Sequence, residues 1–183
     1  MLGSFSLAVT DRIRDHIAAA IGMPGEETSC LVAVATFAKG VSIRQLATLV
    51  GLSHSATVRL VDRLEDRGLV RRSTGRDRRS VAVEATSEGE AAAARVLKTR
   101  AAALADILSA LSERERDELR ALHAKLLDRV IELGSAPIRV CRLCDAQACG
   151  YPDGICPVTQ AADRHGASGR RHGSYPPSHS SGD

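Results

Sequence analysis

The order of local signals across residues 42–83 constrains the fold of this chain more than any other feature. Ser42 is a good N-cap for a short helix with one apolar face, and Gly51 follows as a left-handed stop. After a tight turn, Ser53 caps a second helix. The expected buried side of that helix carries Val58, Val61 and Leu64. These signals predict a helix-turn-helix, a motif that places its second helix in the major groove of DNA.

A charged hairpin is predicted directly after the second helix. Gly68 ends the helix, and residues 69–72 and 80–83 have the character of two short strands around a glycine- and arginine-rich loop. Residues 54–79 contain eight arginines and four acids, a local charge of +4 against +3 for the whole chain. A solvated helix face is one interpretation of this charge. A polyanion partner is the other, with the hairpin acting as a wing whose arginines reach the minor groove.

Individual residues of this region are assigned to DNA by position and type. Arg59 is favoured for base edges, and Arg63, one turn later, for bases or phosphates. Asp77 is expected to fix the wing loop and to orient Arg78 or Arg79 rather than to touch DNA itself. The predicted DNA-binding set is Ser53, His54, Ser55, Thr57, Arg59, Arg63, Asp77, Arg78 and Arg79.

Several of these motifs together resemble a known family of regulators. The resemblance is carried by Leu52-Ser53, the run from Val58 to Val70, the stretch Asp77-Arg78-Arg79-Ser80, and Thr86-Ser87-Glu88-Gly89. They are similar to the multiple-antibiotic-resistance regulator (MarR) family over about residues 28–135. The resemblance implies a winged-helix homodimer that binds double-stranded DNA at a pseudo-palindromic operator. It generally acts as a repressor, relieved by a small-molecule effector or an oxidant.

Long amphipathic helices are predicted on both sides of this region. One starts at Thr86 or Ser87, with Ser87 and Glu90 spaced as a capping box, and the next starts at Ser112 with Glu115. Their apolar stripes are Leu97, Ala101, Leu104, Leu108 and Leu111, then Leu119, Leu122, Leu126, Val130 and Leu133. The stripes alone fit packing within one subunit or between two. The resemblance favours a dimer interface shared with a first helix carrying Val9, Ile13, Ile17 and Ile21.

A cluster of thiols follows the last of these helices. Cys141, Cys144, Cys149 and Cys156 fall within sixteen residues and open with a Cys-x-x-Cys pair. Four thiolates complete a tetrahedral Zn²⁺ shell and equally suit an iron-sulfur cluster. Zinc is favoured because it is the more common metal in such four-cysteine sites. An iron-sulfur cluster is the alternative, and four free cysteines without metal are the third interpretation. Cys30, within an apolar run, is expected to be a buried small residue.

The predicted fold class is mainly α, a winged helix-turn-helix with a two-stranded wing and N- and C-terminal dimerisation helices. The expected divisions are a dimerisation helix (1–25), the DNA-binding region (26–86), dimerisation helices (87–134), a metal-binding loop (135–160) and a disordered tail (161–183).

The absence of an apolar run of about 20 residues and of a signal peptide predicts a cytoplasmic protein with no membrane partner. No phosphate loop or catalytic triad is recognisable, so no enzyme is predicted. The rival hypothesis is a winged-helix protein-interaction module with a structural zinc site.

Overall fold

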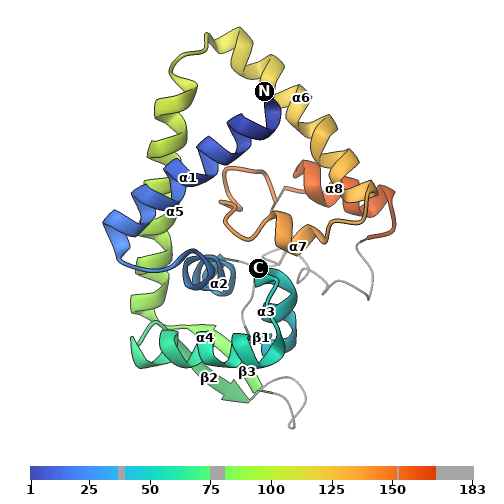
Figure 1. Cartoon of the computed structure of the whole chain (residues 1–183). Coiled ribbons are helices and arrows are strands. Elements are labelled where there is room, and N and C mark those ends of the chain that lie inside the picture. Colours follow the sequence, from blue (N-terminus) through green and yellow to red (C-terminus); the bar gives the residue numbers. More distant parts are fainter. Residues whose placement is uncertain (37–39, 75–80, 152, 168–183) are drawn as a thin grey trace, which may run out of the picture.

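Two long helices form the frame of the molecule in the computed structural model, which describes residues 1–36, 40–74, 81–151 and 153–167. They are α5 (Ser87–Leu108) and α6 (Glu113–Glu132), and they meet at an angle at the top of Figure 1. The N-terminal helix α1 (Leu2–Ile21) crosses α5, and α2 (Gly25–Thr36) lies between α5 and the lower part of the molecule.

The lower part of the molecule is a winged helix-turn-helix, as predicted. It contains β1 (Val41–Ser42), α3 (Ile43–Val50), α4 (His54–Asp66), β2 (Val70–Thr74) and β3 (Val81–Ala85). The strands form an antiparallel sheet in the order β1-β3-β2. The predicted wing had two strands, whereas here the two-residue β1 adds a third by pairing Val41 with Val83. A strand of two residues is too short to carry a period-2 pattern.

The main core lies where α2, α3, α4, the sheet and α5 meet. Its largest fully buried side chains include Leu31, Leu46, Leu60, Leu64 and Val96. Burial of each such leucine contributes about 1.5 to 3 kcal/mol of transfer free energy. Cys30 is also fully buried in this core, as expected. This packing fixes the orientation of α4 relative to the long helices.

The helix starts were predicted well, with one correction. Ser42 and Gln45 form a capping box at α3, and Ser112 and Glu115 form the predicted box at α6. At α5 the cap is Thr86, whose hydroxyl accepts the amide of Gly89 at 3.1 Å. The predicted box of Ser87 and Glu90 is therefore wrong, because the helix begins one residue earlier than that box requires.

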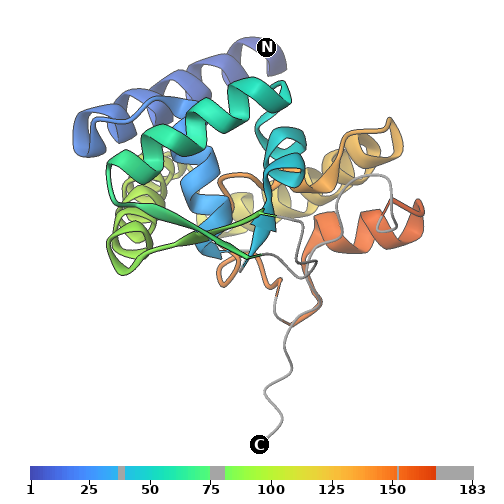
Figure 2. The ribbon, with the colours of Figure 1, turned by 90° about the horizontal axis from the view of Figure 1, so that it is seen from below.

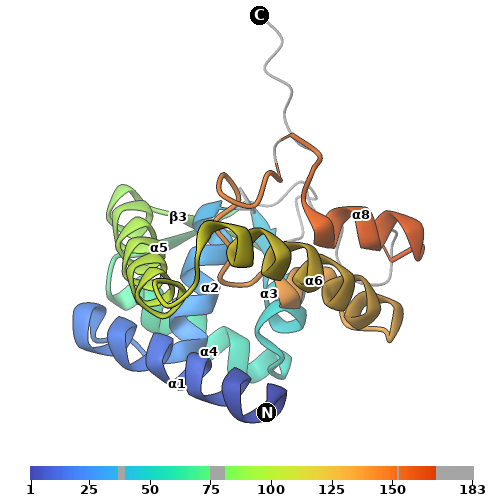
Figure 3. The same cartoon turned by 90° about the horizontal axis from the view of Figure 1, so that it is seen from above.

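The C-terminal part adds two short helices to the frame. They are α7 (Pro137–Val140) and α8 (Pro157–Arg164), and α8 lies alongside α6 (Figure 3). The predicted disordered tail was assigned to begin at residue 161, but Ala161 and Ala162 lie in α8 and are buried, and Ala161 packs in one cluster with Ile131 of α6. Within the described ranges no single helix is long and apolar enough to cross a membrane; α1 and α2 meet that test only jointly, with a bend of 79°.

Candidate functional site

The turn between α3 and α4 sets the direction of α4. Gly51 has a φ of +72°, and the amides of Gly51 and Leu52 both donate to the carbonyl of Ala47, at 2.9 and 3.1 Å. Ser53 then accepts the amide of Ala56 at 3.3 Å and caps α4. A glycine is needed here because only it adopts positive φ without strain. The stop and the cap were both predicted, and both are confirmed.

The first turns of α4 face the solvent on the underside of the molecule (Figure 2). Ser53, His54, Ser55 and Arg59 are all exposed. The first turn of a helix presents unpaired amides and the positive end of the helix dipole, which favours anionic partners. Within the described residues, the guanidinium of Arg59 has no hydrogen-bond or ion-pair partner. This face therefore offers hydroxyl, imidazole and guanidinium groups to a ligand.

Thr57 does not share this exposed face. Its side chain is fully buried, and its hydroxyl donates to the carbonyl of Ser53 at 2.9 Å. The buried side of α4 consists of Thr57, Leu60, Val61 and Leu64, while the predicted member Val58 is only half-buried. Val61 and Leu64 are buried as predicted, and the error is confined to the first turn, where Thr57 instead of Val58 faces the core. In this conformation Thr57 stabilises the turn instead of reaching a DNA surface.

A buried acid holds two arginines at the C-terminal end of α4, Arg63 in the helix and the C-cap Arg67. Glu27 in α2 is 3% exposed, and its carboxylate lies 2.5 Å from Nε of Arg63 and 3.5 Å from Arg67. Arg67 also donates to the carbonyl of Gly22 at 3.4 Å. Sequence reasoning selected Arg63 for DNA and missed Glu27, since no local pattern reveals a carboxylate supplied by a different helix. The pair leaves Arg63 half-exposed but restrained.

The first strand of the wing is also electrostatically paired. Arg71 lies 2.9 Å from Glu84 on β3, while Arg72 contacts both Asp62, at 2.6 Å, and Glu65 on α4. The hydrogen bond with Asp62 is the main reason that the pKa of Arg72 is raised. The predicted wing residues Asp77, Arg78 and Arg79 lie outside the described residues. Among the described arginines of α4 and β2, Arg59 alone lacks an acidic partner, whereas Arg63, Arg67, Arg71 and Arg72 each have one.

The four cysteines that were predicted to bind metal come together. Cys141 and Cys156 are buried, and Cys144 and Cys149 pack half-buried against them in one cluster with Ile131 of α6. Hydrogen bonds between thiols join Cys144 to both Cys141 and Cys149 and join Cys156 to Cys141. The described residues contain no group of three or more His, Cys, Asp or Glu side chains already arranged around a metal position. The thiols thus gather in one cluster, but in this conformation they do not surround a common metal position.

Cys156 is the N-cap of α8, and its thiol has a lowered pKa. Its pKa is lowered to about 5, first by the hydrogen bond from Cys141 and then by the amides of Thr159 and Val158 and the Thr159 hydroxyl. Amides at a helix N-terminus stabilise a thiolate in this way. These contacts favour the thiolate form of Cys156, which is the form in which a cysteine binds metal.

The pKa values of Cys144 and Cys149 are shifted in opposite directions. Hydrogen bonds from Cys141 and Cys149, with the positive charge of Arg100 on α5, lower the pKa of Cys144 to about 7. Burial and the neighbouring negative charge of Cys144 raise the pKa of Cys149 to about 12. Thiols in contact resist the removal of a second proton unless a cation compensates the charge.

A pocket of about 510 Å³ opens where α1 meets the start of α2. Its apolar lining includes Ile17, Met23 and Leu143, the last from the cysteine loop, and Arg14 lies among its polar groups. Sequence reasoning expected an effector without locating its contacts.

The apolar stripe predicted on α6 is largely exposed in the structure. Leu122, Leu126, Val130 and Leu133 are 38 to 69% exposed, and so are Phe5 and Leu7 of α1, at 53 and 68%. Exposed apolar side chains gathered along a helix mark an interaction surface rather than a solvated face.

The family model described as MarR family matches residues 21–80, which span α2, the helix-turn-helix and the start of the wing. Several solved structures of MarR-family proteins are also similar to this chain. A MarR-family transcriptional regulator from Rhodococcus sp. RHA1 is 27% identical, with a TM-score of 0.57, over 68% of this chain and 88% of that one. The MarR-family protein Rv2887 of Mycobacterium tuberculosis, in complex with p-aminosalicylic acid, is 28% identical, with a TM-score of 0.53, over 69% and 98%. This chain has the winged-helix fold of MarR-family regulators, and its residues 21–80 match the family model.

A third similar solved structure is CouR from Rhodococcus jostii RHA1 bound to p-coumaroyl-CoA, which is 26% identical, with a TM-score of 0.54, over 68% of this chain and 87% of that one. MarR-family regulators are non-enzymatic DNA-binding proteins, in agreement with the prediction that this chain is not an enzyme.

Proposed function

We propose that this chain is a homodimeric repressor that binds a pseudo-palindromic operator with one α4 in each major groove. The observation that carries the proposal is the exposed start of α4, where Ser53, His54 and Ser55 lie beside the unpartnered Arg59. Arg59 is free to form a bidentate contact with guanine, whereas Arg63 must first leave Glu27.

The test is fluorescence anisotropy with a duplex from the chain's own upstream region. Arg59→Ala is expected to cost about 1 to 3 kcal/mol on the cognate site and to relax specificity at one base position. Arg114→Ala is the matched control, because Arg114 is 89% exposed at the start of α6, far from α4. Equal weakening on all sequences would assign Arg59 to phosphate. Affinity that barely changes from about 50 to 200 mM salt would refute DNA binding and favour the protein-interaction alternative.

The exposed apolar stripe on α6 supports the dimer. Leu122, Leu126 and Val130 would be buried against a second copy together with the start of α1, as the resemblance to dimeric regulators implies. A two-fold dimer would place the two α4 helices about 34 to 36 Å apart, one turn of DNA. Light scattering of the purified chain should give twice the mass of one chain, and the mass of a single chain would refute this part.

We also propose that the four cysteines bind one thiophilic metal, with Zn²⁺ favoured over an iron-sulfur cluster. In a tetrahedral site with Zn–S bonds of about 2.3 Å, the sulfurs are about 3.8 Å apart, close to the spacing of hydrogen-bonded thiols. A cluster holds its cysteine sulfurs farther apart, because iron and sulfide lie between them. Anaerobic purification followed by elemental analysis should find one zinc per chain and no colour. Visible absorbance with iron and sulfide would identify a cluster instead.

A small-molecule effector is proposed to occupy the pocket between α1 and α2. The relatives with bound p-aminosalicylic acid and p-coumaroyl-CoA suggest an aromatic ligand, which the apolar lining and Arg14 would suit if it carries an acid group. Thermal shift with p-aminosalicylate as the probe, on the wild type and on Arg14→Ala, tests this assignment. A stabilisation of the same size in both proteins would exclude Arg14 as the anion contact.

A further inference from the structure

The short helix α7 connects the cysteine cluster to the helix-turn-helix. On one side, Ile138 is 8% exposed and packs against Leu49 of α3 and Ala33 of α2 in an apolar cluster of their own. On the other side, the amide of Cys141 donates to the carbonyl of Pro137 at 3.0 Å and so continues the helical turn. Cys141, the first thiol, is three positions after Ile138, a rise of about 4.5 Å along a helix.

A second contact joins α7 to the turn that aims α4. The guanidinium of Arg139 lies over Gly51, so close that a Cβ at residue 51 would be 2.8 Å from its Cζ atom. Gly51 is the residue whose positive φ redirects the chain from α3 into α4. A displacement of α7 therefore changes the packing at the C-terminus of α3 on two sides, through Ile138 and through Arg139.

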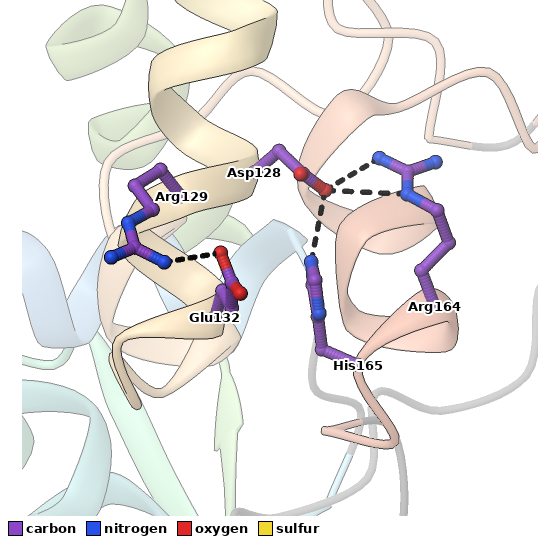
Figure 4. A network of polar contacts seen from close by, with 5 residues as sticks. All are labelled: Asp128, Arg129, Glu132, Arg164 and His165. Carbon is purple, nitrogen blue, oxygen red and sulfur yellow. Dashed lines mark hydrogen bonds and ion pairs between the residues drawn. The ribbon is translucent and has the colours of Figure 1, made fainter.

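The other end of the cysteine loop is attached to the long helices. Val158 and Ala161 of α8 pack against Ile131 of α6. Asp128 of α6 accepts hydrogen bonds from Arg164, at 2.7 and 3.3 Å, and lies 3.2 Å from His165 (Figure 4). Cys156, as the N-cap of α8, belongs to this attached end. The cysteine loop thus spans from the frame of long helices to the helix-turn-helix.

We propose that metal bound by Cys141, Cys144, Cys149 and Cys156 fixes α7 to α8, and thereby holds α3 and α4 in the orientation that binds DNA. This inference rests on the proposed function, because it names how the DNA-binding surface is controlled. Cys141 is the ligand on the α7 side and Cys156 the ligand on the α8 side, so a metal held by both closes the link. When the metal is lost, α7 is no longer tied to α8 through the thiols. Only the contacts of Ile138 and Arg139 then hold it against α3, and it loosens. The metal-free protein then binds its operator more weakly.

The experiment compares zinc-loaded and EDTA-treated full-length protein on the same operator duplex. Operator affinity of the wild type is expected to fall on metal removal by about 5- to 150-fold, the usual range of coupling between two sites. Ile138→Ala should bind the same one zinc per chain but show a much smaller change, because it cuts α7 from α3 without altering a thiol. Ile155→Ala is the matched control, an aliphatic truncation in the same loop at a side chain that is 65% exposed, and it should behave like the wild type.

Hydrogen exchange of the wild type gives a second readout that does not depend on how well Ile138→Ala folds. Amides of α3 and α7 are expected to exchange faster after zinc removal, and those of α5 to remain unchanged. If the wild type binds its operator equally well with and without zinc, or if α3 exchange does not respond, the coupling is refuted while the DNA-binding proposal stands. If neither form binds any duplex, the proposed function itself fails.

Discussion

Substituting Glu27 by glutamine tests whether the buried carboxylate restrains the arginines of α4. The change keeps the shape of the side chain and removes its charge. The side chain of Glu27 is 4% exposed, while those of Arg63 and Arg67 are 54% and 42% exposed. Breaking a fully buried pair costs about 3 to 5 kcal/mol, and an exposed pair contributes about 1 kcal/mol or less. Because water already screens the two arginines, we expect a loss of about 1 to 2 kcal/mol.

The same substitution should change DNA binding in the opposite direction. Once released, Arg63 and Arg67 can turn toward phosphates, and each new phosphate contact steepens the plot of log affinity against log salt by about 0.9. Glu27→Gln is therefore expected to bind nonspecific duplex more tightly at low salt, with a slope steeper by up to about 1.8. Thermal unfolding measures the stability, where about 2 to 8 °C of lowered Tm corresponds to the expected loss. Anisotropy titrations at several salt concentrations measure the slope.

Glu26→Gln is the control for both measurements. Glu26 precedes Glu27 in the first turn of α2, carries the same charge and is exposed. It therefore reproduces the change in net charge and in the helix-dipole interaction without breaking the pair. If the two variants have the same Tm and the same slope of log affinity against log salt, the ion pair does not restrain Arg63 in solution. The reasoning that separates Arg59 from Arg63 would then be wrong.

Three further predictions concern stability and assembly. Gly89→Ala should destabilise the protein by about 3 kcal/mol in chemical denaturation, because the new Cβ would lie 1.9 Å from the backbone oxygen of Leu69. Gly3→Ala is the control and should leave the stability unchanged, because nothing lies within 4 Å of the new Cβ. Leu126→Glu, at a side chain that is 48% exposed in one subunit, should convert the dimer to a monomer in light scattering; an unchanged mass would place the interface elsewhere. Hydrogen bonds from Arg164 lower the pKa of Asp128, so the contact stabilises the fold above the ordinary aspartate pKa of about 3.9 and is lost as pH falls through the lowered value. The Tm difference between wild type and Asp128→Asn should therefore be present at neutral pH and vanish in strong acid, and a difference independent of pH would rule out this contact as its cause.

Sequence reasoning succeeded where a local rule decides the structure. A cap is set by a hydroxyl and an amide three residues away, so Ser42, Ser53 and Ser112 could be assigned without knowledge of the fold. The buried face of α4 was harder, because Thr57 and Val58 are neighbours and both are β-branched. Only the packing of Leu60 and Leu64 against α2 and the sheet determines which of the two points inward.

The cysteine region was predictable in its chemistry but not in its placement. The spacing of Cys141, Cys144, Cys149 and Cys156 predicted that the thiols meet, and they do. Nothing in that spacing reveals that Ile138 docks on α3 or that α8 attaches to α6. The four residues of α7 are too few to show a helical period, and the buried face of α8 is made chiefly of small alanines that a polar tail also contains. Such contacts depend on which distant surface happens to be apolar.

Because most arginines of this region are paired with carboxylates, they contribute less to DNA affinity than their number suggests, and the contribution of a second subunit becomes larger. A window with a local charge of +4 suggests a broad basic surface, but in the described part of α4 and β2 only Arg59 is without a carboxylate. One subunit thus places few unrestrained charges from this part on the phosphates. Joining two subunits makes the second contact intramolecular and multiplies the affinity. Leu126→Glu should consequently weaken operator binding more than Arg59→Ala does, although Leu126 lies on α6, far from α4. If Arg59→Ala has the larger effect instead, one subunit already provides most of the affinity.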